Sequence, residues 1–288
     1  MSATTTPRGV RTAAGARTGG PTFGRVVASE WTKLTSLRSP WWTGLVTVVA
    51  AGALAFMFAT ASSVDPGFEP TRDLATGLML AQVGPLVLGV LLGAGEFRTG
   101  AARTTFTLVP RRWPVLAAQT VVVAGFALGL AVLTVAATVV GVLPSAVSRD
   151  LPLRLTVGDT PGILAGMVLL VVGVTLVGYA LGTLLRRTVP ALVTALGVVL
   201  VLPIVLAMAG DPGGGTMGAA PPHSVTALGA IGAFTPGTAG QLLTTPASYG
   251  PMPGMPDVGP VGGGLVLGAW IVLLLTVAAV RLRTRDVR

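Results

Sequence analysis

Few residues in this chain of 288 could carry out chemistry. The chain has no cysteine, which excludes a disulfide framework, a thiolate nucleophile and a cysteine-ligated metal. Its single histidine, His223, stands beside Ser224 in a Gly- and Pro-rich segment, and no Gly-x-Ser-x-Gly motif occurs. A lone histidine in a loop is typical of a solvated residue. We therefore expect no catalytic, cofactor-binding or metal-binding residue, and we expect that the chain is not an enzyme.

The single lysine, Lys33, decides whether the chain could bind ATP by itself. A Walker A loop places its lysine in Gly-Lys-Ser/Thr, so that the amine reaches the nucleotide phosphates. Lys33 lies between Thr32 and Leu34 instead. If the protein uses ATP, we expect a separate subunit to bind it.

Lys33 belongs to a charged and aromatic stretch, EWTKLTSLRSPWW, directly before a long apolar run. Taken as a helix with about 100° per residue, the segment separates an apolar side from a polar side. This pattern predicts an amphipathic helix over residues 23–39 that lies in the headgroup plane and ends at Pro40. Its apolar side consists of Phe23, Val26, Val27, Trp31, Leu34 and Leu37. The residues expected at the interface are Glu30, Trp31, Lys33, Arg38, Trp41 and Trp42.

Glu30 falls in the middle of the apolar side of this helix. A carboxylate on an apolar face is costly unless it has a partner. Two kinds of partner remain open, which are Lys33 at i+3 and an arginine from another segment. We hypothesise the second, with Arg98 or Arg103 as the partner.

The composition indicates an integral membrane protein. Hydrophobic residues make up 52% of the chain and charged residues 10%, and the mean hydropathy is +0.81, far from the balance of a soluble domain. A membrane-spanning helix needs about 20 mostly apolar residues, whereas barrel strands alternate. The continuous apolar runs predict an all-α, polytopic fold with six transmembrane helices. The predicted spans are residues 41–62, 76–95, 114–143, 161–185, 189–209 and 261–280.

The charge distribution predicts the orientation. Sixteen of the 19 basic residues lie before span one, after spans two and four, or after span six. The other three, and seven of the ten acids, lie in the alternate segments. By the positive-inside rule, we expect both termini to be cytoplasmic. The net charge of +9 then reflects topology, and no nucleic-acid partner is expected. The predicted spans hold no Asp, Glu, Lys, Arg or His, which argues against an ion-coupled carrier.

The segment between spans two and three, EFRTGAARTTFTLVPRRW over residues 96–113, is too polar to span a membrane. We expect a short helix over residues 100–108, closed by Pro110. The segment could be a solvated connector whose arginines stop transfer. Its mixture of apolar residues with Arg103 favours docking onto a partner.

Three segments carry a resemblance to a known family. EWTKLTSLRSPWW resembles the Glu-Trp-x-Lys-Leu-x-Ser-Leu-Arg-Ser-x-Trp-Trp pattern of actinobacterial ABC-2 type permeases. GEFRTGAARTTFTLVPRR is similar to their Glu-Tyr/Phe-Arg-x-Gly-x-x-Arg-x-Thr-x-x-x-x-Pro-Arg-Arg loop, with Phe97 where the family often has Tyr. FTPGTAGQLL, over residues 234–243, resembles the short Pro-x-x-Ala-Gly-Gln segment before their last span. Together with the six spans, these matches cover nearly the whole chain from Phe23 onward.

The resemblance implies the permease subunit of an ABC transporter in the bacterial plasma membrane, powered by two copies of a separate ATP-binding subunit. A second permease subunit, like or unlike the first, completes such a transporter within the membrane lipid. The expected cargo is a hydrophobic or amphipathic compound that is exported. The alternative is a membrane anchor or sensor subunit that binds cytoplasmic partners without transport. The family's contacts with the ATP-binding subunit imply a coupling role for Glu96, Arg98, Arg103, Arg111 and Arg112.

Three further features complete these expectations. Residues 1–22 are expected to form a disordered cytoplasmic tail. The outer segment over residues 210–260 is expected to be a flexible loop with one short helix near its centre, within residues 225–243. Small-residue pairs can mark close helix contacts, but with 40 glycines in the chain we expect chance to explain most of them. Within the predicted spans, the Gly-x-x-x-Gly pairs are Gly89/Gly93, Gly125/Gly129, Gly162/Gly166, Gly178/Gly182 and Gly264/Gly268.

Overall fold

The computed structural model describes residues 22–98, 112–210, 225–246 and 254–284. These residues form helices and connecting turns, and no β-strand occurs among them. Six helical segments are long and apolar enough to cross a membrane, which confirms the predicted all-α, six-span class. They are Arg38–Ser62, Asp73–Gly95, Pro114–Ser148, Thr160–Leu185, Thr188–Ala209 and Gly259–Arg281.

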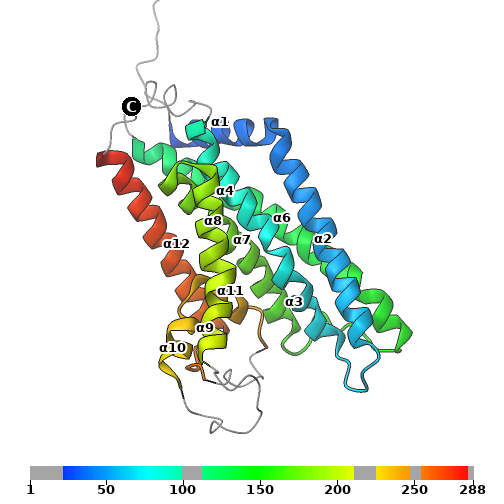
Figure 1. Cartoon of the computed structure of the whole chain (residues 1–288). Coiled ribbons are helices and arrows are strands. Elements are labelled where there is room, and N and C mark those ends of the chain that lie inside the picture. Colours follow the sequence, from blue (N-terminus) through cyan, green and yellow to red (C-terminus); the bar gives the residue numbers. More distant parts are fainter. Residues whose placement is uncertain (1–21, 99–111, 211–224, 247–253, 285–288) are drawn as a thin grey trace, which may run out of the picture.

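Most of the helices run along the bundle, whereas the first lies across one of its ends, which we call the α1 end (Figure 1). The predicted second span consists of two helices in sequence, and the predicted fifth span contains a π-helix between two α-helices. In chain order the elements are α1 (Phe23–Ser36), α2 (Arg38–Ser62), α3 (Pro70–Ala81), α4 (Val83–Arg98), α6 (Arg112–Ser148), α7 (Thr160–Leu185), α8 (Thr188–Leu196), η1 (Gly197–Val201), α9 (Leu202–Gly210), α10 (Ala227–Ala233), α11 (Pro236–Leu242) and α12 (Gly259–Thr284).

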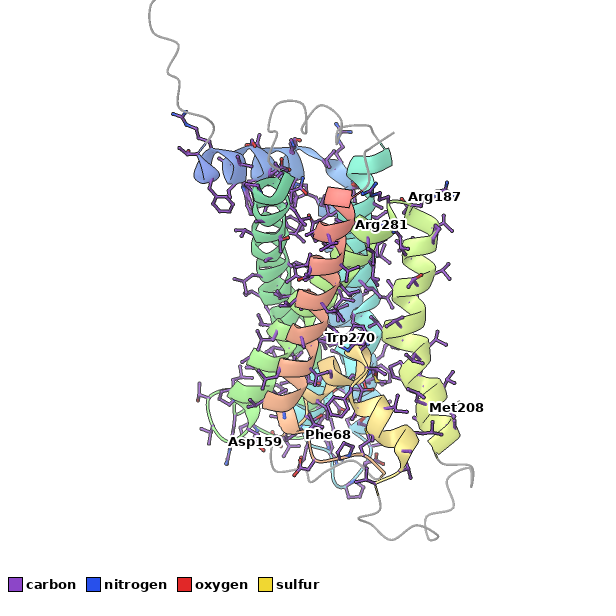
Figure 2. The ribbon with its side chains drawn as sticks, turned by 90° about the vertical axis from the view of Figure 1, so that its left-hand side faces the viewer. Phe68, Asp159, Arg187, Met208, Trp270 and Arg281 are labelled. Atoms are coloured by element: carbon purple, nitrogen blue, oxygen red, sulfur yellow. The ribbon has the colours of Figure 1, made fainter. Side chains whose placement is uncertain are left out.

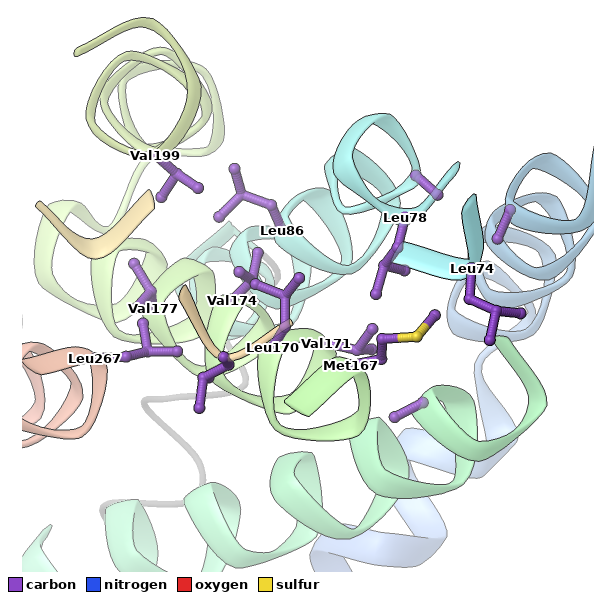
Figure 3. Close-up of a cluster of buried hydrophobic side chains, with 14 of the residues drawn as sticks. Leu74, Leu78, Leu86, Met167, Leu170, Val171, Val174, Val177, Val199 and Leu267 are labelled. Atoms are coloured by element: carbon purple, nitrogen blue, oxygen red, sulfur yellow. The ribbon is translucent and has the colours of Figure 1, made fainter. Parts of the chain in front are cut away.

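α7 is the central helix of the bundle. In its most apolar window 67% of the residues are buried, against 28% for α2 and 22% for the last span, so protein covers much more of α7 than of those two helices. Met167, Val171 and Val174 of α7 pack with Leu78 of α3 and Leu86 of α4 (Figure 3). This core positions α4 and α7 with respect to each other.

Glycines set the close approach of α4 to α7. A methyl group added at Gly89 or Gly93 of α4 would overlap the backbone carbonyl of Thr175 or Tyr179 of α7, respectively. Gly178 and Gly182 of α7 have the same relation to the backbone of α4. Two of the five Gly-x-x-x-Gly pairs therefore form a single mutual crossing, as small residues allow in membranes. The pairs that include Gly129, Gly162 and Gly268 each leave one glycine facing open space.

The second span is interrupted at Gln82. Pro85 has no backbone N–H, so the carbonyl of Ala81 loses its usual helical donor. The side chain of Gln82 is fully buried, and its Nε2 donates a hydrogen bond of 2.7 Å to the carbonyl of Met79. No donor within the described residues reaches its Oε1. The half of this span far from the α1 end, α3, packs mainly on α2, whereas the half nearer the α1 end, α4, packs mainly on α7.

The segment after α9 contains two short helices, α10 and α11, where we expected one. α11 is buried along almost its whole length because it packs against α7, α12 and η1. Gly237 allows it to approach the carbonyl of Val199 in the π-helix. Trp270 of α12 donates a hydrogen bond of 2.8 Å from its indole Nε1 to the carbonyl of Phe234, between α10 and α11. This part of the predicted flexible loop is therefore packed structure.

The two ends of the bundle differ in charge, as the sequence predicts. Arg187 and Arg281 lie at the α1 end, and Asp159 lies at the opposite end (Figure 2). The described residues of both chain ends, α1 and the end of α12, also lie at the α1 end (Figure 1). The predicted helix over residues 100–108 lies outside the described residues, as does the predicted tail apart from Thr22.

Candidate functional site at the α1 end of the bundle

α1 is a separate helix because the chain cannot continue it through Pro40. A proline ring clashes with the carbonyl four residues earlier and removes a donor, so a helix containing Ser36 must end before Pro40. Leu37 is accordingly extended, with φ −80° and ψ 136°, and α2 begins at Arg38. Pro40 then occupies the first turn of α2, where its missing N–H costs nothing. The chain turns at this point, and α1 lies across the end of the bundle (Figure 1).

α1 presents one face to the bundle. Val26, Glu30 and Leu34, spaced four residues apart, are buried against the bundle. The predicted apolar side is broader than this face, because Phe23 and Trp31 remain 50% and 44% exposed. These aromatic side chains lie at the edge of the buried face, where an interfacial helix meets the headgroups.

Glu30 is buried, with 6% of its surface exposed, in the position that the helical pattern predicts. Its Oε1 accepts a hydrogen bond of 2.5 Å from Nζ of Lys33, one turn further along α1. Its Oε2 accepts a longer one, 3.4 Å, from Nε2 of Gln119 in α6. The local pair is therefore present in the structure. The hypothesised pair with Arg98 or Arg103 stays a prediction, because those side chains lie outside the described part of the chain.

The hydrogen bonds continue from α6 into the centre of the bundle. The hydroxyl of Tyr179 in α7 donates a hydrogen bond of 3.1 Å to Oε1 of Gln119. A carboxylate only accepts, so Glu30 fixes the orientation of the Gln119 amide and turns Oε1 toward the tyrosine. The four side chains from Lys33 to Tyr179 thus join α1, α6 and α7, and we call them the α1 latch. Its members are Lys33, Glu30, Gln119 and Tyr179.

The sequence analysis missed two members of the α1 latch, Gln119 and Tyr179. Both interrupt long apolar runs, and a polar residue inside a predicted span was the only available signal. Apolar side chains surround the latch, including Leu34, Leu116 and Val123. Glu30 and Tyr179 are buried, and a low-dielectric environment strengthens the polar contacts of such groups and makes them costly to break.

Two tryptophans follow α1 at the start of α2. Trp41 donates a hydrogen bond of 3.0 Å from its indole Nε1 to the carbonyl of Thr35 and meets Phe126 edge to face, with ring centroids 5.6 Å apart. Trp42 is 65% exposed, and Arg38 is exposed beside it. Trp41 therefore fastens the corner between α1 and α2, and Trp42 is free to meet the headgroup layer.

The structure does not describe the side chains of the five residues that are expected to contact an ATP-binding subunit. Glu96 and Arg98 belong to the last turn of α4, and Arg112 is the first residue of α6, but their side chains lie outside what is described. Arg103 and Arg111 lie outside the described residues altogether. The structure therefore shows only where α4 ends, which is at the same end of the bundle as α1 (Figure 1).

Hydrogen bonds from two arginine side chains to backbone carbonyls join α7 to the last span at the α1 end. Arg281 of α12 donates a hydrogen bond of 2.6 Å from Nη1 to the carbonyl of Leu184, and Arg186 donates one of 3.4 Å from Nη2 to the carbonyl of Arg281. Arg186 adopts the left-handed conformation, with φ 57°, which ends α7. These hydrogen bonds hold α7 and α12 together at the α1 end.

The described side chains at the α1 end form hydrogen bonds, an ion pair and apolar contacts. Among the residues that the structure describes, no group of three or more His, Cys, Asp or Glu side chains could hold a metal ion. Comparison with protein-family models finds no match for this chain, and comparison with curated protein sequences finds none either.

Proposed function

We propose that this protein is the permease subunit of an ATP-driven ABC transporter of the ABC-2 type. It exports a hydrophobic or amphipathic compound across the plasma membrane of a bacterium. Two copies of a separate ATP-binding subunit power it, and a second permease subunit, identical or different, completes the membrane part. The positive-inside rule makes the α1 end cytoplasmic in this proposal.

One observation carries the proposal. α1 lies across the same end of the bundle at which α4 ends and leads into residues 99–111 (Figure 1). These are the two elements whose sequences resemble the ABC-2 segments that contact an ATP-binding subunit. In this proposal, α1 and the end of α4 therefore meet the same soluble partner in the cytoplasm.

Two properties of the sequence support the same conclusion. The chain lacks a Walker A lysine, so the energy for transport must come from another subunit. The described spans hold ionisable residues only near their ends, which leaves no path of charged groups for a coupled ion. Closure of the ATP-binding pair would then push on α1 and on the end of α4, and rock the helices attached to them.

The experiment compares Glu96→Ala and Arg103→Ala with the parent chain, each coexpressed with the product of the adjoining reading frame, which the proposal expects to be an ATP-binding protein. A charge-assisted contact contributes about 1.5–3 kcal/mol, so loss of one contact should weaken association or ATPase stimulation roughly tenfold or more. Arg154→Ala is the matched control, because Arg154 is exposed at the opposite end. Permease abundance in the membrane should stay normal in all three.

The result also separates this proposal from an anchor or sensor subunit. A partner that copurifies but is a kinase or regulator without ATPase-driven transport would favour the anchor. If copurification, ATPase rate and export are all unchanged in Glu96→Ala and Arg103→Ala, segment 99–111 is only a connector and the coupling role is wrong.

A further inference from the structure

We propose that Gln119 and Tyr179 are positioning residues that fix the place of α1 on the bundle and tie it to α4, the helix that leads into residues 99–111. The tie itself is independent of transport. Only its purpose, to move the two partner-binding elements together, rests on the proposed function.

The first arm of the tie is the α1 latch. It begins at Lys33, which is 47% exposed on α1, and passes through the buried carboxylate of Glu30. It ends at the hydroxyl of Tyr179, whose side chain is only 2% exposed. Gln119 is the middle of this arm because its amide donates to Glu30 with one atom and accepts from Tyr179 with the other.

The second arm reaches the same residue from α4. Gly93 packs so closely on the carbonyl of Tyr179 that an added methyl group would overlap it. One turn earlier, a methyl group at Gly89 would lie 2.8 Å from the backbone nitrogen of Tyr179. Tyr179 therefore meets α1 through its side chain and α4 through its backbone.

This arrangement leaves little freedom for α1 and α4 to move separately. A close-packed interior transmits displacement instead of absorbing it, and buried polar bonds are costly to break. A shift of α1 that keeps the latch intact must carry Tyr179 with it. A shift of Tyr179 must carry the backbone of α4, because no side chain separates the two at Gly93.

The test uses the absence of cysteine from the chain. Two cysteines are introduced for spin labels, at the exposed positions Thr32 of α1 and Val277 of α12, and the distance distribution is measured in lipid. Tyr179→Phe removes the neutral hydrogen bond to Gln119, and the loss of such a bond corresponds to a roughly two- to tenfold larger population of displaced α1. Thr134→Val is the matched control, since it removes a fully buried hydroxyl whose hydrogen bond, 2.8 Å to the carbonyl of Leu130, stays within α6.

A positioning role predicts a broader or second distance peak in Tyr179→Phe and an unchanged distribution in Thr134→Val. A merely structural role would lower stability in both variants and leave both distributions like the parent. Identical distributions in parent and Tyr179→Phe, or equal broadening in the two variants, would overturn the proposal.

The second arm is tested with Gly93→Ala, for which Gly268→Ala is the control because Gly268 faces open space. The tie predicts that Gly93→Ala shifts the label on α1, although the substitution is on α4. If Gly93→Ala does not fold, Tyr179→Phe still decides. Failure of an ATP-binding protein to copurify with the parent chain would refute the proposed function, whereas the label result needs no partner and would still decide the tie.

Discussion

Gln82→Met should stabilise the protein. Gln82 continues a row of fully buried residues spaced four apart, Leu74, Leu78, Leu86 and Val90, and is its only polar member. An acceptor buried without a donor costs about 1–3 kcal/mol. Flipping the amide does not help, because Oε1 would then face the carbonyl of Met79, which now accepts from Nε2.

The expected net effect follows from these terms. Methionine has a similar length and no unsatisfied acceptor, and its apolar side chain suits the surrounding row. The substitution also removes the hydrogen bond to Met79, which contributes about 0.5–1.5 kcal/mol. The difference is a gain of about 1 kcal/mol in the free energy of unfolding.

Gln119→Met is the control with the opposite sign. Gln119 is also within a span, but both of its amide atoms have partners, and its removal takes a donor from the buried carboxylate of Glu30. We expect a loss of about 1–3 kcal/mol. The measurement is reversible unfolding in mixed micelles for parent and both variants. If Gln82→Met is destabilised as much as Gln119→Met, Oε1 of Gln82 has a donor after all, and the reasoning fails.

Three further predictions concern topology, the helix crossing and the ion pair. Val64 and Val189 are both exposed and lie at opposite ends of the bundle. In intact cells, a membrane-impermeant thiol reagent should label a cysteine at position 64 but not one at position 189. Labelling at position 189 would contradict the predicted orientation. Gly178→Ala should lower the free energy of unfolding by about 1–3 kcal/mol through overpacking, whereas Gly129→Ala, which meets open space, should not; equal stabilities would contradict the close crossing. Lys33→Met should cost more stability than removal of an exposed ion pair, because it leaves the buried carboxylate without its cation; a change below about 0.5 kcal/mol would show that the pair is a surface contact.

Local patterns were sufficient to predict the six membrane-spanning segments, but not the break in the second span or the two short helices before the last span. Hydrocarbon offers no partners to the backbone, so a continuous apolar run of about 20 residues must form a helix wherever it crosses the membrane. The helical period also predicted that Glu30 lies on the buried face of α1, because spacing alone determines which residues share one face of a helix. Pro40 similarly indicated a break between α1 and α2, although α1 ends at Ser36 and not at residue 39, and Pro40 itself lies in the first turn of α2.

Tertiary packing decided which residues meet. Gln119 lies 89 residues from Glu30 and 60 from Tyr179. Helical spacing shows only that Gln119 is polar within an apolar run, whereas the crossing of α1 over α6 decides that its amide reaches Glu30. The same holds for the glycine pairs, which look alike in sequence although only those of α4 and α7 oppose each other. Side-chain partners depend on the angle and depth at which helices cross, and these are set by the packing of the whole bundle, to which every span contributes.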